Sequence, residues 1–220
     1  MKKNILIIGG SSGIGLEIVK NLNDEHNIFV ANRTNDSLSG LNHQYIKIDV
    51  SMETLDPTTL PDSLDGLVYC PGSINLRPFR GLKPETFIED FNLNVMGAVR
   101  SIGAVLKNLN NSSQASIVLF STVAVQTGMP FHSSVAVSKG AIEGLTRSLA
   151  AELAPKISVN AIAPSLVNTP LAEKFLNSES KMERAVERHP LKKVGSAKEI
   201  ANFAIHLLFN SSWITGQIFG

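Results

Sequence analysis

The chain of 220 residues has one cysteine and no long apolar run. The single thiol, Cys70, excludes an intramolecular disulfide bond and is typical of a reducing compartment, so we expect a cytoplasmic protein. A membrane-spanning helix needs about 20 consecutive apolar residues, and no segment comes near that length. The apolar run Ile5–Ile8 follows two lysines but is too short for the core of a signal peptide.

The sequence also lacks an excess of charge of either sign. The formal net charge is +1, and the basic pair Lys192-Lys193 is not part of a larger cluster, so we expect neither a nucleic-acid partner nor a membrane surface. The five histidines are scattered without the spacing of metal ligands, and we expect no metal site. A hydrophobic share of 43% and a charged share of 18% indicate an ordinary globular protein with a large core.

Short apolar runs alternate with stretches of helical periodicity along the whole chain. Alternation of this kind predicts an α/β fold with a doubly wound parallel sheet of six to seven strands and helices on both faces, in one domain spanning residues 1–220. The expected strands are Ile5–Ile8, Ile28–Ala31, Tyr45–Ile48, Leu67–Tyr69, Ile117–Phe120, Ile157–Ala163 and, as a seventh, Gly216–Phe219. The expected long helices are Glu85–Leu109, Ser133–Ala154 and Ala197–Leu208. The segment between the second and third strands is too short for a full crossover helix.

The most informative segment is the glycine-rich turn Gly9-Gly10-Ser11-Ser12-Gly13-Ile14-Gly15, between the first strand and an amphipathic stretch. Glycines let such a turn approach a pyrophosphate closely, and the N–H groups at the following helix start attract its negative charge. The same residues fit the G-x-S-x-G nucleophile elbow, but an elbow at Ser11 leaves no room for the strands that precede it in a hydrolase. A phosphate-binding P-loop is excluded because Leu16-Glu17 stands where Lys-Ser or Lys-Thr is needed.

Ligands of a doubly wound sheet bind beyond the carboxyl ends of its strands, so the residues that follow each apolar run are the candidate site. Arg33, after the second strand, either binds a 2′-phosphate, which favours NADP(H) over NAD(H), or is a solvated loop charge. Asp49, after the third, either accepts a hydrogen bond from an adenine amino group or caps a turn. The other candidates at strand ends are Cys70-Pro71-Gly72, Ser121-Thr122 and residues 164–169.

Several motifs in order make the chain resemble the short-chain dehydrogenase/reductase superfamily over essentially its full length. These motifs are the glycine-rich turn, Asp49-Val50, Asn94-Val95-Met96-Gly97, residues 138–150, residues 159–164 and Ile214-Thr215-Gly216. The resemblance implies a Rossmann fold that binds NAD(P)(H), and a homodimer or homotetramer. Small residues recur every three or four positions in two stripes, and we expect the subunits of this oligomer to meet along them. The stripes are Gly97, Ser101, Ala104 and Ala136, Gly140, Gly144.

The resemblance also implies roles for individual cofactor-binding residues. Gly9, Ser11, Ser12, Gly13, Ile14 and Gly15 hold the pyrophosphate side. Asn32 and Arg33 select NADP(H), Asp49 and Val50 frame the adenine, and Lys139 holds the nicotinamide ribose. Pro164, Val167 and Thr169 contact the carboxamide and phosphate. The family's Asn-Asn-Ala-Gly element is replaced by Tyr69-Cys70-Pro71-Gly72, which keeps only the glycine.

The implied catalytic residues depart from the family pattern. The family's proton donor is a tyrosine four residues before the lysine, and here Val135 stands four residues before Lys139. Thr122 takes the place of the serine that binds the substrate oxygen, with Ser121 beside it, and Asn94 remains. Lys139 itself is one alternative acid, and the other is His132, for which a surface position at a helix start is the favoured interpretation.

We therefore expect an NADP(H)-dependent oxidoreductase that transfers hydride between nicotinamide and a small carbonyl or alcohol substrate, with an altered proton relay. The alternative is a catalytically silent NADP(H)-binding sensor or scaffold. The charged segment Ala172–Arg188, framed by Pro170 and Pro190, predicts a mobile two-helix lid over the substrate pocket. The segment 128–131 is expected to border the same pocket.

Overall fold

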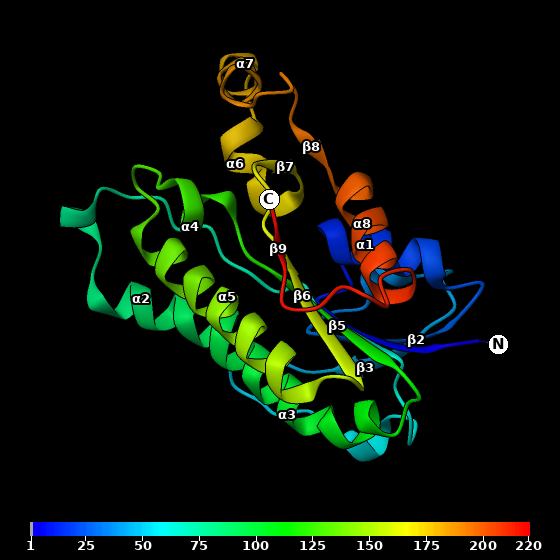
Figure 1. Ribbon diagram of the computed structural model, residues 1–220. Coiled ribbons are helices and arrows are strands. Elements are labelled where there is room, and N and C mark those ends of the chain that lie inside the picture. The colour runs from blue at the N-terminus through cyan, green and yellow to red at the C-terminus, as the bar shows by residue number, and fades with distance from the viewer. Residues whose placement is uncertain (1) are drawn as a thin grey trace.

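A computed structural model of the protein, which describes residues 2–220, contains one large parallel sheet (Figure 1). Its seven strands follow the order β3-β2-β1-β4-β5-β6-β9, and every neighbouring pair is parallel. The strands are β1 (Asn4–Ile8), β2 (Asn27–Asn32), β3 (Gln44–Lys47), β4 (Gly66–Tyr69), β5 (Ala115–Phe120), β6 (Ile157–Ile162) and β9 (Ile218–Phe219). The doubly wound α/β fold predicted from the sequence is confirmed.

Helices cover both faces of this sheet, as Figure 1 shows. One face carries α2 (Pro84–Phe91), α3 (Gly97–Asn110) and α5 (Ser133–Leu153), and the other carries α1 (Gly13–Leu22) and α8 (Ala197–Phe209). Side chains alternate along a strand, so β1 sends Leu6 and Ile8 into the core under α3 and α5, and Ile5 and Ile7 into the core under α1 and α8. Both faces are buried, which is why the strands consist of continuous apolar runs.

The expected single helix over residues 85–109 is interrupted. A five-residue π-turn, Asn92–Met96, separates α2 from α3. The Tyr69 hydroxyl from β4 donates a hydrogen bond to the Leu93 carbonyl at 2.6 Å, and it lies so close to Gly97 that a Cβ there would overlap it. A π-turn widens the helix locally and is frequent at functional sites. The sequence did not reveal the π-turn, because the residues on either side of it keep a nearly helical apolar spacing.

The predicted lid lies between the two strands of a second, two-stranded sheet that the sequence did not predict. In it β7 (Val167–Asn168) pairs with β8 (Gly195–Ser196). Between them lie a turn of 3₁₀ helix (Pro170–Ala172), α6 (Glu173–Leu176) and α7 (Glu179–Arg188), which project beyond one end of the large sheet (Figure 1). The two predicted lid helices are therefore present, and both ends of the segment are held at one place.

The prediction that the small residues of α3 meet a partner helix was wrong. Gly97 faces Tyr69, and Ser101 is 2% exposed, so both contribute to packing within the chain. On α5, by contrast, Gly144 is exposed and has open space around it. Within residues 2–220, no helix combines the length and apolar character that a membrane crossing needs.

Candidate active site

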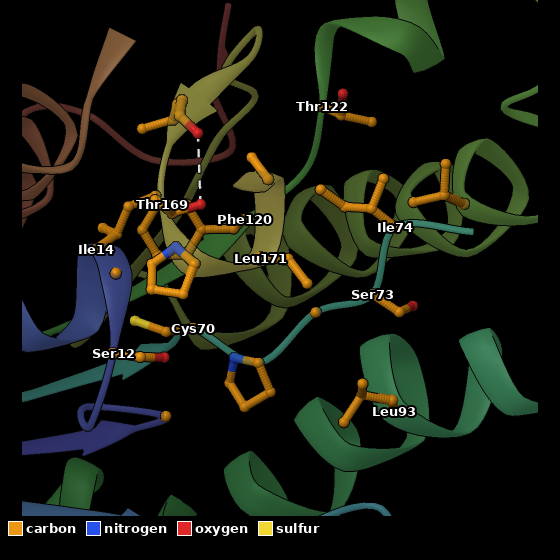
Figure 2. A pocket seen from close by; sticks show the side chains of 18 of the residues that line it. Ser12, Ile14, Cys70, Ser73, Ile74, Leu93, Phe120, Thr122, Thr169 and Leu171 are labelled. Carbon is orange, nitrogen blue, oxygen red and sulfur yellow. Dashed lines mark hydrogen bonds between the residues drawn. The ribbon is translucent and has the colours of Figure 1, made fainter. Parts of the chain in front are cut away.

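A cavity of about 1090 Å³ lies where the strands of the large sheet end. This is slightly above the range of about 300–1,000 Å³ typical of ligand pockets. In Figure 2, Ser12 and Ile14 lie on one side of it, and Ser73, Ile74 and Thr122 on the other. The predicted catalytic residue Asn94 is fully buried and does not line the cavity, but it donates a hydrogen bond to Ser73, which does. The predicted site residues that line the cavity are Gly9, Ser11, Ser12, Gly13, Ile14, Gly15, Asn32, Arg33, Asp49, Val50, Cys70, Pro71, Gly72, Thr122, Lys139, Pro164, Val167 and Thr169.

The glycine-rich turn has a shape that only glycines allow. A Cβ on Gly15 would overlap the carbonyl oxygen of Gly9, so this helix start packs directly against the turn. Gly9 and Gly13 have φ angles of +79° and +52°, which side chains strongly disfavour. A Cβ on Gly13 would lie 3.3 Å from Thr169 Cγ2, so the turn also touches the segment after β7.

The start of α1 is open toward an anion. Ser12 is the N-cap residue in extended conformation, and its side chain makes no capping hydrogen bond to the first turn of the helix. The first N–H groups of a helix have no intrahelical partner, and they carry partial positive charge. A pyrophosphate would satisfy them, which fits a dinucleotide at this turn.

At the end of β2, Asn32 and Arg33 differ in exposure. The Asn32 side chain is buried, and neither its nitrogen nor its oxygen has a partner among the described residues. A buried amide without partners is costly, so it points to a polar ligand that completes it. Arg33 lines the cavity but is exposed, with its charge available to a ligand.

Asp49 caps the turn that follows β3. Its Oδ1 accepts hydrogen bonds from the backbone N–H and the hydroxyl of Ser51, at 3.0 and 2.6 Å. These hydrogen bonds hold the pKa of the Asp49 carboxyl below its usual value. The turn-capping role considered from the sequence is therefore present. Oδ2 accepts no hydrogen bond from residues 2–220, so the position by the adenine remains compatible with the same side chain.

Lys139 brings a buried ammonium group to the cavity. Its side chain is 8% exposed, and Nζ has no hydrogen-bond acceptor within the described part of the chain. Both Nζ and the Oδ1 of Asn94 lie 3.4 Å from the point where a Cβ on Gly72 would be. Burial lowers the pKa of Lys139 to about 8, against the opposing effects of Cys70 and Asp90. An acid that titrates near neutral pH is suited to proton transfer.

Behind the lysine, Asp90 organises a buried polar cluster that the sequence analysis missed. Asp90 is 1% exposed, and its Oδ1 accepts hydrogen bonds from Ser73 Oγ at 2.5 Å and Asn75 Nδ2 at 2.7 Å. Asn94 Nδ2 donates to the Asp90 carbonyl at 2.7 Å and to Ser73 Oγ at 3.0 Å. Asp90 Oδ2 and Asn94 Oδ1 have no partner among residues 2–220. The sequence did offer one signal for this cluster, because Asp90 stands four residues before Asn94, on the same side of a helix.

Thr122 and Ser121 point their hydroxyls in different directions. Thr122 caps α4 (Val123–Thr127), and its Oγ1 accepts the N–H of Ala124 at 3.3 Å, which leaves the hydroxyl proton free. Ser121 instead donates to the buried Glu143 at 2.8 Å. Of the two neighbouring hydroxyls, only the one on Thr122 is available to a molecule in the cavity.

No tyrosine lines the described cavity. Val135, four residues before Lys139, forms part of its wall and is 5% exposed. The hydroxyls of Tyr45 and Tyr69 donate to the carbonyls of Asn32 and Leu93 instead. His132 does line the cavity, and its Nδ1 lies 2.7 Å from the Pro130 carbonyl, to which it donates.

The remaining walls come from the lid and from loops. Apolar side chains of Ile74, Leu76, Met129, Leu171 and Phe175 line this part of the cavity. Three basic residues of α7 also line it, namely Lys181, Arg184 and Arg188. The cavity therefore combines a polar floor with a largely apolar wall and a basic edge.

Residues 9–220 match the family described as enoyl-(acyl carrier protein) reductase. The chain is 31% identical to carbonyl reductase family member 4 of Danio rerio, over 99% of this chain and 95% of that protein. It is 26% identical to the 3-oxoacyl-[acyl-carrier-protein] reductase FabG of Buchnera aphidicola subsp. Baizongia pistaciae, over 99% and 94%.

Solved structures match with the same coverage. A short chain dehydrogenase family protein from Francisella tularensis subsp. tularensis SCHU S4 superimposes with a TM-score of 0.89 at 29% identity, covering 100% of this chain and 96% of that one. ElxO with NADP bound gives a TM-score of 0.90 at 26% identity, with 100% and 96% covered. Its tyrosine-to-phenylalanine variant with NADPH bound gives 0.87 at 25% identity, with the same coverage.

Proposed function

Because the chain belongs to the short-chain dehydrogenase/reductase superfamily, we propose that it is an NADP(H)-dependent oxidoreductase acting on a small carbonyl or alcohol substrate through an altered proton relay. The observation that carries the proposal is the buried ammonium of Lys139, which lines the same cavity as the free Thr122 hydroxyl. The relatives named above are reductases, which supports an oxidoreductase.

The glycine-rich turn, Asn32 and Arg33 would hold the cofactor. The turn offers free N–H groups to a pyrophosphate, and the unpartnered Asn32 amide and exposed Arg33 lie where an adenosine 2′-phosphate is recognised in folds of this kind. NADP in the related ElxO structure supports the same assignment. When bound, the nicotinamide cofactor supplies or accepts the hydride.

Thr122 would orient the substrate and Lys139 would provide the proton. The Thr122 hydroxyl, with its acceptor side occupied by Ala124, donates to the carbonyl oxygen of a ketone or aldehyde. That oxygen gains negative charge as the carbon is reduced, and the Lys139 ammonium then donates a proton to it. Val135 contributes no hydroxyl. Because its side chain is short, the ammonium of Lys139 is accessible from the cavity.

Asp90 and Asn94 would keep this lysine charged and in place. The buried Asp90 carboxylate raises the pKa of Lys139 against the effect of burial. Asn94 is held by two hydrogen bonds, with its free Oδ1 on the side of Gly72 where Nζ also lies. A water between Oδ1 and Nζ would satisfy both groups, and solvent that enters the cavity would supply the proton that returns to the lysine after each turnover.

The purified protein should oxidise NADPH when ketones or aldehydes are added, with one alcohol formed per NADPH consumed. We expect Lys139→Met to abolish turnover and Thr122→Val to lower kcat by about 10²-fold or more, the scale of one hydrogen bond to a developing oxyanion. If NADPH binds tightly but no carbonyl in a broad panel is reduced, the silent sensor or scaffold becomes the better account. That alternative is favoured by a single observation, the absence of a tyrosine from the cavity.

We also propose that the protein forms a homodimer or homotetramer. The face made by α2, α3 and α5 leaves Ile88, Phe91, Val99 and Val137 exposed. Apolar side chains gathered on one helical layer favour burial against a second copy by closed symmetry.

A further inference from the structure

The charges of helix α7 are separated between two faces. Lys181, Arg184 and Arg188 follow the spacing of one helical face and line the cavity. The acids of the same helix, Glu179, Glu183 and Glu187, do not line it, although they are exposed like Arg184 and Arg188. The lid therefore turns its positive side toward the candidate active site.

The two arginines have donors to spare. Arg184 Nε donates to the Ser180 carbonyl at 3.0 Å, and its terminal nitrogens have no partner within residues 2–220. Arg188 makes neither a hydrogen bond nor an ion pair in the same range. Lys181 differs, since its ammonium donates to the Lys174 carbonyl and to Asn177, and so holds α6 against α7.

Repulsion between the two arginines opposes the favourable position of Arg188 in the last turn of the helix. Arg184 and Arg188 lie four residues apart, where like charges repel by a few tenths of a kcal/mol. Glu187 does not neutralise them, because it pairs with Lys192 at 3.1 Å. Uncompensated bases that face a cavity are better explained by an anion bound there than by the stability of the lid.

The acids around the cavity do not oppose this interpretation. The two acids that line the cavity lie on other elements than the lid, since Asp49 follows β3, where it accepts hydrogen bonds from Ser51, and Glu89 belongs to α2. Near the lid the wall is apolar, with Leu171 and Ile74 both visible in Figure 2. A ligand that suits this wall has an apolar body and a negative end.

We infer that Arg184 and Arg188 bind an anionic group of the substrate, a carboxylate or a phosphate, at a distance from its reacting carbonyl carbon. The inference rests on the proposed function, because it specifies the substrate class of the same cavity. Guanidinium groups form paired hydrogen bonds with both kinds of anion, and two of them on one helical face would select charged substrates over neutral ones.

Three ketones of similar length test the inference. They are 6-oxoheptanoate, 5-oxohexyl phosphate and, as the neutral reference, methyl 6-oxoheptanoate. We expect kcat/KM for at least one anion to exceed that for the ester by about tenfold, the effect of one hydrogen bond to a charged group. The double variant Arg184→Gln/Arg188→Gln should reduce this ratio to near one. Lys198→Gln, which removes an exposed positive charge outside the cavity, should leave it unchanged.

Calorimetric titration separates this inference from the proposed function. Binding of an anion to the wild type and its loss in the double variant would support the inference even if no ketone were reduced. Active enzyme with equal kcat/KM for ester and anions would overturn it and leave the reductase function intact. A large loss of NADPH affinity in the double variant would also overturn it, because the arginines would then belong to the cofactor site.

Discussion

Val135 occupies the wall of the cavity four residues before Lys139, where a hydroxyl would lie beside the ammonium. Val135→Tyr should raise kcat for a generic ketone by about 10²–10⁴-fold, the usual contribution of a general acid, with NADPH affinity nearly unchanged. Ala151→Tyr is the matched control, because Ala151 is exposed on the same helix and does not line the cavity. A folded, NADPH-binding Val135→Tyr protein without a rate gain would favour the silent sensor.

The alkaline limb of the pH profile should report Lys139. A lysine that donates a proton must be protonated, and burial places its pKa at about 8. We therefore expect kcat/KM for reduction to be level below that pH and to fall about tenfold per unit above it. Asp90→Asn removes a charge that raises this pKa, so the fall should begin at lower pH. Glu85→Gln, an exposed change on the same helix, should not move the profile, and an unmoved profile in Asp90→Asn would contradict the assigned role.

Arg33 should decide between the two nicotinamide cofactors. Because a 2′-phosphate has no counterpart in NAD(H), the loss of a charge-assisted hydrogen bond in Arg33→Ala should weaken NADPH binding by about tenfold. NADH binding should change little. Calorimetric titration of both cofactors checks this, and equal affinities in the unmodified protein would contradict the NADP(H) assignment.

Sequence reasoning at the level of single residues was limited by what local patterns reveal. Positions after strand ends could be listed in advance, because parallel strands deliver their carboxyl ends to one edge. Asp90 could not be recognised in that way. An acid on an amphipathic helix is ordinarily solvated, and the burial of Asp90 depends on Ser73 and Asn75, which lie 17 and 15 residues earlier in a loop. The assigned roles of the listed residues stay predictions.

Among the elements, the central strands and the helix over residues 133–154 were predicted well, whereas the short strands and the interruption of the helix over residues 85–109 were not. The helix over residues 133–154 and the strands β1 to β6 have clear periodicity or continuous apolar runs. The two-residue strands β7 and β8 are too short to carry any pattern. The π-turn depends on a residue from another element, since the Tyr69 hydroxyl of β4 donates a hydrogen bond to the Leu93 carbonyl within the turn.

The π-turn should be sensitive to any side chain at Gly97. Because a Cβ there would overlap the Tyr69 hydroxyl, Gly97→Ala should lower the free energy of unfolding by about 1–3 kcal/mol, the usual cost of overpacking. It should also displace Asn94 and lower kcat. Adding Tyr69→Phe to this variant removes the clashing oxygen and should recover part of the loss, which denaturant titration would show.

A second glycine on the same helix provides the control. Gly103 on α3 is exposed and has nothing within 4 Å of its Cβ position. Gly103→Ala should therefore stabilise the protein by about 0.5–1 kcal/mol through helix propensity. Equal effects of the two glycine variants would argue against a specific fit of Tyr69 to the π-turn.

On the scale of the whole molecule, the layered fold could be predicted from the pattern of apolar residues alone. A sheet covered on both faces needs apolar residues at successive positions, and such runs alternating with helices admit few other arrangements. The assembly of several copies did not follow in the same way. The α3 stripe of small residues fills space inside the chain, so the exposed apolar residues of α2, α3 and α5 are the better guide.

The proposed assembly predicts a mass of at least twice 23.7 kDa in light scattering at micromolar concentration. Val99→Arg, on the exposed α3 face, should shift the protein toward the monomer because a buried unpaired charge opposes association. Leu191→Arg, at a 72% exposed position outside that layer, should not. A single species of 23.7 kDa for the unmodified protein would contradict the proposal.

The pairing of β7 with β8 has a consequence for how the chain can vary. Val167 lies beside Gly195, so everything between them leaves the body of the protein and returns to it at one point. Such a segment can be exchanged, because its length and sequence can change while the distance between its two ends, set by the pairing of β7 with β8, stays the same. Transplanting only the part that corresponds to residues 170–194 from a related enzyme would then carry over substrate choice, while Thr169 and the rest of the cofactor site remain those of the recipient.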